Sequence, residues 1–201
     1  ILLDLSGTEI TGKAAEAGAA MVPKQRLTVV ETDASVKVDT GKIAFNVLKT
    51  KAFGLVENVI AAGKSVVAGG QISYIDGLTD KRYTADVPDA ISVHYAGPMR
   101  VTIEARGKFQ GDQTAGLCYC TYITAWAGRS DILVRHSLIN SNPNRFFMTK
   151  VKSSRIALTP AVPSAKSLAG TDKPLELDGS GQAVLHQGLE EQRNRQLPSC
   201  L

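Results

Sequence analysis

The chain has 201 residues, of which 43% are hydrophobic and 21% charged, and its formal net charge is +4. This composition is ordinary for a packed globular protein and excludes collagenous, coiled-coil and disordered chains. The positive excess is small and does not cluster, so we expect no nucleic-acid partner.

The first predicted elements are a short helix and a series of β-strands. Residues 11–21 are alanine-rich and favour a helix, although Gly18 interrupts it. Beyond it, apolar and polar residues alternate with period two, which is typical of strands. The predicted strands are 27–31, 35–38, 42–48, 54–60, 71–75 and 91–95, with turns at Asp39-Thr40-Gly41 and Asp76-Gly77.

The strongest pattern is a series of four long strands between Pro98 and Thr159. Turn-forming residues separate them at 111–116, 128–130 and 141–144, and connections of this length suit hairpins. Strands of about ten residues exceed the usual five or six and favour a large sheet. We therefore expect a mainly β fold: an antiparallel β-sandwich or open barrel with long meandering strands and little helix.

Alternation assigns the side chains of these strands to two faces. In the first long strand Met99, Val101, Ile103 and Ala105 form an apolar face, and Arg100, Thr102, Glu104 and Arg106 form a face with charges of both signs. We expect the apolar face to be buried and the charged face to meet solvent or a ligand. In the third strand, His136 shares an apolar row with Ile132, Val134 and Leu138.

The domain organisation follows from a change of composition after Pro160. Residues 1–160 predict one β domain, and the Pro-, Ser- and Gly-rich residues 161–201 predict an extended linker or peripheral arm. Because the chain opens at Ile1 with an apolar run and no Met, we expect a fragment or processed chain that is truncated at its N-terminus. No apolar stretch approaches the ~20 residues that cross a bilayer, so we expect no membrane partner.

Two motifs are similar to a phosphate-binding loop and to a disulfide or metal site, but neither meets the requirements of such a site. Ala61-Ala62-Gly63-Lys64-Ser65 is similar to a phosphate-binding loop, but the earlier glycine is replaced by Asn58, and a hairpin turn is favoured. Cys118 and Cys120 lie two residues apart on one strand, which is at the far limit of disulfide geometry. Zinc needs about four ligands, and no C-x₂-C pair supplies them, so we expect no metal and no cofactor.

The long strands carry residue types that bind sugars. Aromatic rings stack on pyranose faces, and arginine pairs with the carboxylates of acidic sugars. Arg100, Glu104, Arg106, Tyr119, Tyr122, Trp126, Arg129 and Arg135 supply both types, and His94 and Tyr95 lie at a strand end, where ligands often bind. The alternative is a solvated sheet face of mixed charge with Trp126 in the core.

Three motifs in this region resemble one known family. They are Gly97-Pro98-Met99-Arg100-Val101, Ala125-Trp126-Ala127-Gly128 and Arg135-His136-Ser137-Leu138-Ile139-Asn140. They look like the G-P-x-R-V strand, A-x-A-G turn and R-x-H-S/T-x-x-N strand in the N-terminal β-barrel and β-sandwich region of exo-rhamnogalacturonan lyase-like proteins. Upstream, Asp39-Thr40-Gly41 resembles the family's D-T-G strand, and the similarity covers about residues 1–160.

The resemblance implies part of a secreted or periplasmic protein that degrades acidic, pectin-like polysaccharide and has further domains in the same polypeptide. A lyase must neutralise a uronate carboxylate, remove a proton and protonate the leaving oxygen. The candidates by residue type are His136, Tyr122 and Arg135 for catalysis, and Arg100, Trp126, His94 and Tyr95 for substrate binding. Alone, the chain is expected to be an incomplete catalyst; the alternatives are a non-catalytic carbohydrate-binding or structural β module, or a β-rich assembly protein.

Overall fold

The computed structural model describes residues 26–112, 116–141, 149–161, 164–167 and 175–178. None of these residues is helical, so these ranges hold no helix that could cross a membrane. The helix expected at 11–21 lies outside them. The strands are β1 (Thr28–Glu31), β2 (Ser35–Asp39), β3 (Ile43–Leu48), β4 (Glu57–Ala61), β5 (Lys64–Asp76), β6 (Arg82–Thr84), β7 (Ala90–Ala96), β8 (Arg100–Lys108), β9 (Leu117–Trp126), β10 (Ile132–Asn140), β11 (Val151–Pro160), β12 (Ser164–Ser167) and β13 (Leu175–Asp178).

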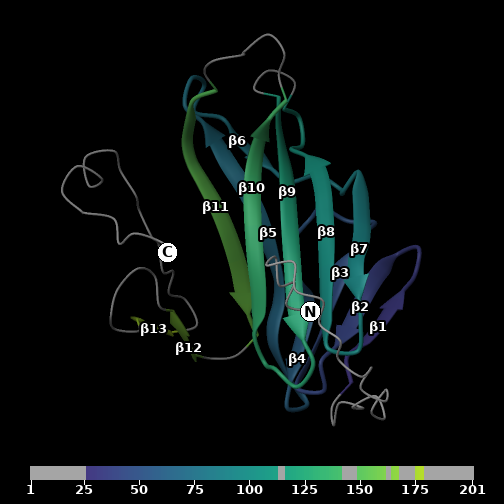
Figure 1. Cartoon of the computed structure of the whole chain (residues 1–201). Helices are drawn as coiled ribbons and strands as arrows, with labels where there is room; N and C mark the ends of the chain where they lie inside the picture. The colour runs from purple at the N-terminus through teal and green to yellow at the C-terminus, as the bar shows by residue number, and fades with distance from the viewer. Residues whose placement is uncertain (1–25, 113–115, 142–148, 162–163, 168–174, 179–201) are drawn as a thin grey trace, which may run out of the picture.

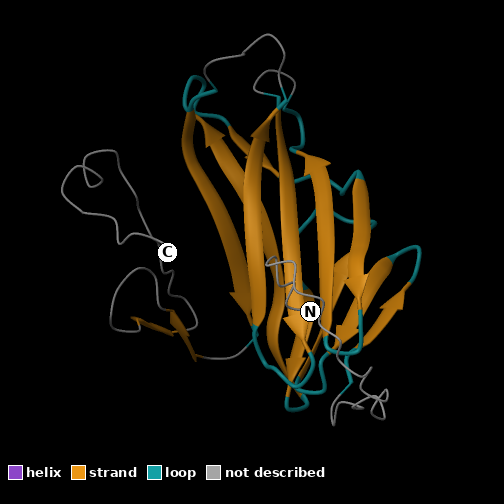
Figure 2. Cartoon of the chain, in the orientation of Figure 1, coloured by secondary structure: helices purple, strands orange, loops and turns teal. Residues whose placement is uncertain are grey.

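Two antiparallel sheets form a sandwich. The larger sheet has the order β1-β2-β3-β4-β5-β11, with β6 also paired to β5, and the four-stranded sheet has the order β10-β9-β8-β7. Figure 1 shows the four-stranded sheet lying in front of the larger one, and Figure 2 shows that strands make up both layers. The predicted antiparallel β-sandwich is therefore confirmed.

The core lies between the sheets and follows the alternation of the sequence. Val38 and Phe45 pair across β2 and β3, and Ile103 and Ile123 pair across β8 and β9; all four are at least 99% buried. Burying such side chains contributes about 1.5–3 kcal/mol each. The apolar face predicted for β8 is thus confirmed except at Met99, which precedes the strand and is 53% exposed.

The connections of the long strands agree with the prediction twice and differ once. The β8–β9 and β9–β10 pairs are antiparallel neighbours, as expected for hairpins. The third expected hairpin is wrong, because β11 pairs with β5 in the larger sheet instead of with β10. The long strand β5 offers β11 a partner, and Ile156 there faces the fully buried Ile72.

Strand boundaries differ where the backbone departs from extended geometry. The strand expected from Gly54 begins at Glu57, since Leu55 has φ 74°, which an extended strand does not allow. Residues 64–70 of β5 were missed because Gly69 and Gly70 weaken the strand pattern, and β6 was missed because it spans only three residues.

The Gly-Lys-Ser motif forms the hairpin turn that was expected. Ala61 pairs with Lys64 across β4 and β5, and the two residues between them, Ala62 and Gly63, have φ 47° and 74°. Two successive positive φ values define a tight two-residue hairpin turn. The loop therefore joins two strands instead of a strand and a helix.

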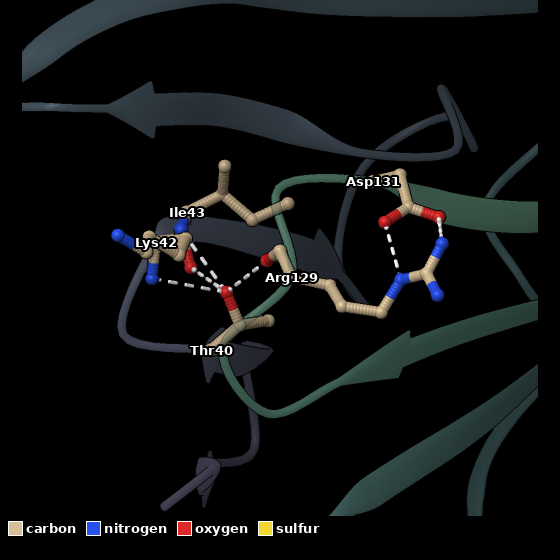
Figure 3. Close-up of polar contacts among 5 residues, drawn as sticks. All are labelled: Thr40, Lys42, Ile43, Arg129 and Asp131. Atoms are coloured by element: carbon tan, nitrogen blue, oxygen red, sulfur yellow. Dashed lines mark hydrogen bonds and ion pairs between the residues drawn. The ribbon is translucent and has the colours of Figure 1, made fainter. Parts of the chain in front are cut away.

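Thr40 joins the two sheets at one end of the sandwich (Figure 3). Its fully buried hydroxyl donates to the Arg129 carbonyl at 2.7 Å and accepts from the Ile43 amide at 3.0 Å. The Gly128 amide in turn donates to the Thr40 carbonyl at 2.7 Å. The β2–β3 turn and the β9–β10 turn are thereby fixed to one another.

Candidate functional site

The charged face predicted for β8 is the outward face of the four-stranded sheet. We call it the polar face; it comprises His94 and Tyr95 of β7, Arg100, Thr102, Glu104 and Arg106 of β8, Cys120, Tyr122, Thr124 and Trp126 of β9, and Leu133, Arg135 and Ser137 of β10. The register aligns Glu104 with Tyr122 and Tyr122 with Arg135. Glu104 therefore lies in a row that crosses the sheet.

Glu104 is the centre of a hydrogen-bonded cluster. Its side chain is only 7% exposed because longer side chains cover it. Arg106 donates from Nε at 2.7 Å and Cys120 from Sγ at 3.3 Å, both to Oε1, and His94 Nε2 lies 2.5 Å from Oε2. The carboxylate is thus bound from both neighbouring strands and from its own.

These contacts set the charge of the cluster. Burial raises the pKa of Glu104, but hydrogen bonds from His94, Tyr122, Arg106 and Cys120 lower it more, to about 2. The same carboxylate raises the pKa of Tyr122, whose hydroxyl donates to it. At neutral pH Glu104 is ionised and Tyr122 protonated, so neither is poised to accept a proton.

A β-bulge in β7 places two of the predicted residues on the polar face. Val93 pairs with Ile103 and Tyr95 with Thr102, so His94 is the extra residue. Such a bulge redirects the side chains that follow it. Tyr95, which simple alternation would place inward with Val93, is 48% exposed and lies beneath the Arg100 guanidinium.

Arginines stack on aromatic rings at three places on this side of the sheet. Arg100 lies 4.8 Å from the Tyr95 centroid and Arg135 lies 5.4 Å from that of Tyr122. In the described part of the chain, no carboxylate is paired with either guanidinium. Stacking holds the planar group in place and leaves its edge N–H donors for a ligand.

The third stacked arginine differs from the other two. Arg129 lies 5.6 Å from the Trp126 centroid, but its Nε and Nη2 also donate to Asp131 at 2.7 and 2.9 Å (Figure 3). The charge of Arg129 is therefore already neutralised by Asp131. Trp126 is half-buried beside Arg100 on the polar face, so it does not lie in the core, where the alternative of a solvated mixed-charge face placed it.

His136 lies on the opposite face of the sheet from the other six predicted site residues. It projects into the sandwich, where Nδ1 is 2.7 Å from Thr121 Oγ1 and the ring stacks on Tyr119 with a centroid distance of 6.4 Å. Its buried Nε2 has no hydrogen-bond partner among the described residues, and burial lowers the pKa of the imidazole. The structure thus does not bring His136 together with Tyr122 and Arg135.

The residues that sequence reasoning missed as a cluster are Glu104, Arg106 and Cys120. Their alternation along β8 and β9 was visible, but finding their contacts requires the register between the strands. Cys118 and Cys120 are free thiols, and no group of three or more metal-ligating side chains occurs among the described residues. A surface hollow lined by Thr28, Val30, Lys37 and Asp39 lies on the other sheet and shares no residue with the polar face.

Comparison with known proteins identifies the domain. A family model described as the PcRGLX-like protein central beta sandwich domain matches residues 27–151, more than half of the chain. The chain belongs to this family. The PcRGLX-like match confirms the resemblance to exo-rhamnogalacturonan lyase-like proteins, and of the barrel and sandwich implied by that resemblance it corresponds to the sandwich. No curated protein matches the chain.

Proposed function

We propose that this PcRGLX-like sandwich binds an acidic, pectin-like polysaccharide on its polar face, as one part of a larger carbohydrate-active protein. The proposal rests on Arg100 and Arg135, which are both exposed and stacked on tyrosines and have no carboxylate partner in the described part of the chain. An arginine edge matches a carboxylate in a two-point hydrogen bond. Polysaccharides of this class lie outside cells, so the protein that carries the domain is proposed to be secreted or periplasmic.

The remaining groups of the polar face suit a sugar chain. Trp126 and Tyr95 lie beside Arg100, and the guanidiniums of Arg129 and Arg100 stack on them, so the rings hold the arginines in place at the surface. Thr102 and Thr124, whose hydroxyls lie 3.2 Å apart, add neutral hydrogen-bonding groups between the two arginines. An open sheet face with these groups fits a long polymer better than a small enclosed ligand.

The same geometry supports binding over bond cleavage by this face. Lyase chemistry requires a group that accepts a proton next to the uronate. Glu104 is ionised but occupied by its four donors, Tyr122 is protonated, and His136 is on the inner face. We therefore favour the non-catalytic binding module over a complete lyase and assign any cleavage to residues outside the polar face.

Binding to rhamnogalacturonan, measured by calorimetry, tests the proposal. Arg135→Gln and Arg100→Gln should each weaken binding about tenfold, because each removes a charge-assisted hydrogen bond. Lys37→Gln, on the larger sheet, is the matched control and should leave the affinity unchanged. Equal affinity for the polymer after reduction of its carboxyl groups would contradict the proposal.

A separate assay for cleavage of the polymer tests the catalytic alternative. Cleavage by a lyase forms an unsaturated sugar that absorbs in the ultraviolet, so the chain is incubated with the same polymer and the absorbance followed. We expect binding without product. Product that disappears in Tyr122→Phe or in His136→Ala would instead assign catalysis to this domain and overturn the binding-module assignment.

A further inference from the structure

The two arginines on which the proposed function rests lie over separate aromatic rings. Arg100, the first residue of β8, stacks on Tyr95, and Arg135 of β10 stacks on Tyr122. Tyr122 is paired with Glu104, which follows Arg100 by four residues on β8. At about 3.3 Å per residue, the rows of Arg100 and Glu104 are about 13 Å apart along the strands.

The Tyr95 ring is held at the Arg100 end of the sheet by a glycine. A Cβ atom at Gly97 would lie 2.8 Å from Tyr95 Cε1 and 2.9 Å from its hydroxyl oxygen, so the ring packs directly on the Gly97 backbone. The Gly97 amide in turn donates to the Arg100 carbonyl at 3.0 Å, where β7 and β8 are joined. Only a residue without a Cβ atom leaves room for the ring in this position.

The Tyr122 ring is held in the Glu104 row. Its hydroxyl donates to the Glu104 carboxylate, and its centroid lies 6.1 Å from that of His94, which contacts the same carboxylate. Arg135 lies above this ring at 5.4 Å from the centroid. The second guanidinium is therefore held at the row of Glu104, away from the first.

The row between the two rings is uncharged. Thr102 pairs with Thr124, and Thr124 pairs with Leu133. A carboxylate forms a two-point hydrogen bond with one guanidinium, and a group of that size cannot span the two rows. The two arginines can therefore bind two carboxylates, but they cannot share one.

We propose, on the basis of the function proposed above, that the polar face has two uronate subsites that bind two sugars of one polymer chain at the same time. The Tyr95 subsite consists of Arg100 and Tyr95, and the Tyr122 subsite consists of Arg135 and Tyr122. Once one uronate is bound, binding of the second is intramolecular, so the affinity rises without any new kind of contact. The face therefore selects a polymer by the spacing of its carboxylates.

NMR titration of the labelled whole chain tests this arrangement with two rhamnogalacturonan oligosaccharides, a short one with a single uronate and a long one with several. The short ligand should shift the signals of both subsites. Arg100→Gln should remove the response of the Tyr95 subsite alone, and Arg135→Gln that of the Tyr122 subsite alone. The long ligand should bind about tenfold more tightly than the short one, and each variant should remove most of this gain.

Gly97→Ala tests how the Tyr95 ring is positioned. The added methyl group should displace this exposed ring, so the gain from the long ligand should be lost. Tyr95→Ala, which removes the ring and leaves the backbone unchanged, should have the same effect, and Tyr95→Phe should have none. Gly69→Ala on β5 is the matched control, because a Cβ atom there would meet Glu57 Cγ at an ordinary 3.7 Å.

The possible outcomes separate the two-subsite arrangement from the proposed function. Equal affinity for the short and the long ligand, or loss of both responses in one arginine variant, would overturn the two subsites and leave binding by the polar face in place. A full gain in both Gly97→Ala and Tyr95→Ala would also overturn them. Binding of neither ligand would overturn the proposed function and the subsites with it.

Discussion

Glu104 has the most constrained charge on the polar face. Its carboxylate is 7% exposed and accepts hydrogen bonds that come from β7, β8 and β9. A buried ion is stable only when its surroundings replace the water it has lost. Glu104 therefore acts as an anchor that orients Arg106, His94 and Tyr122 around it.

Replacing this anchor should cost stability. Glu104→Gln keeps the shape but removes the charge that its donors require, and we expect the free energy of unfolding in urea to fall by about 2 kcal/mol at pH 7. Asp131→Asn, in an exposed pair with Arg129, is the control and should leave the free energy of unfolding nearly unchanged. Equal losses in the two variants would contradict the anchor role.

The stabilisation by Glu104 should disappear in acid. Its pKa in the folded chain, about 2, lies below its ordinary value of 4.5, so the unfolded chain takes up the proton first as the pH falls. The contribution is complete above pH 4.5 and is lost between pH 4.5 and 2. Urea unfolding of wild type and Glu104→Gln should therefore converge across that window; a constant gap would refute the assignment.

His136 predicts a different pH window. Burial lowers its pKa below the ordinary 6.5, so the unfolded chain binds the proton more readily and stability falls as the pH drops through 6.5. The melting temperature of wild type should decline between pH 7.5 and 5.5, and that of His136→Gln should decline less. Glu104→Gln should keep the wild-type slope in this window, and a slope unchanged in His136→Gln would exclude a buried neutral imidazole.

At the scale of elements, the two turns that join the sheets contribute to the stability of the sandwich. Thr40 connects the β2–β3 turn to the β9–β10 turn, and both turns belong to motifs that indicated the family. The family-like motifs therefore mark the framework, and the side chains that project from it form the polar face.

Thr40→Val should lower the free energy of unfolding by about 2 kcal/mol, because it leaves the buried Ile43 amide without its acceptor and the Arg129 carbonyl without its donor. Thr40→Ser retains the hydroxyl and should lose less than half as much. Chemical denaturation compares the two, and a valine variant as stable as wild type would show that the junction is not needed.

Sequence patterns predicted the strands of the four-stranded sheet well because each strand buries one face. The same alternation placed His136 inward and Arg135 outward correctly. It could not predict the bulge at His94, since an extra residue in a strand leaves no mark on composition. The cluster around Glu104 and the outward position of Tyr95 depend on that bulge and on the register, which no single strand determines.

The pairing of β11 with β5 could not be predicted for a related reason. A hairpin between consecutive strands is the shortest connection, and the sequence between β10 and β11 offered turn residues. Pairing of β11 with β5 depends instead on which strand is left with an open edge, a property of the whole sheet. Long-range pairing of this kind is not encoded in local periodicity.

At the scale of the whole molecule, β11 is part of the sandwich although it begins where the family match ends. A chain that ends at Ala161 should unfold cooperatively with nearly the stability of the full chain. A chain that ends at Lys150 lacks β11, exposes the edge of β5 beside Ile72, and should lose several kcal/mol or fail to fold. Equal thermal unfolding of the two chains would show that β11 is dispensable.

The sandwich presents a fixed set of side chains on the outward face of its four-stranded sheet. Because the polar face is built on strands and its arginines stack on aromatic rings, the proposed binding of a polysaccharide would carry a reduced entropy cost.

The most direct test of the proposed function is an NMR titration of the isotopically labelled chain with a rhamnogalacturonan oligosaccharide. We expect the largest shift changes at Arg100, Tyr122 and Arg135, together with the Trp126 indole, and none at Lys37 on the outer face of the larger sheet. Shift changes centred on β1 and β2, or none at millimolar ligand, would contradict binding by the polar face.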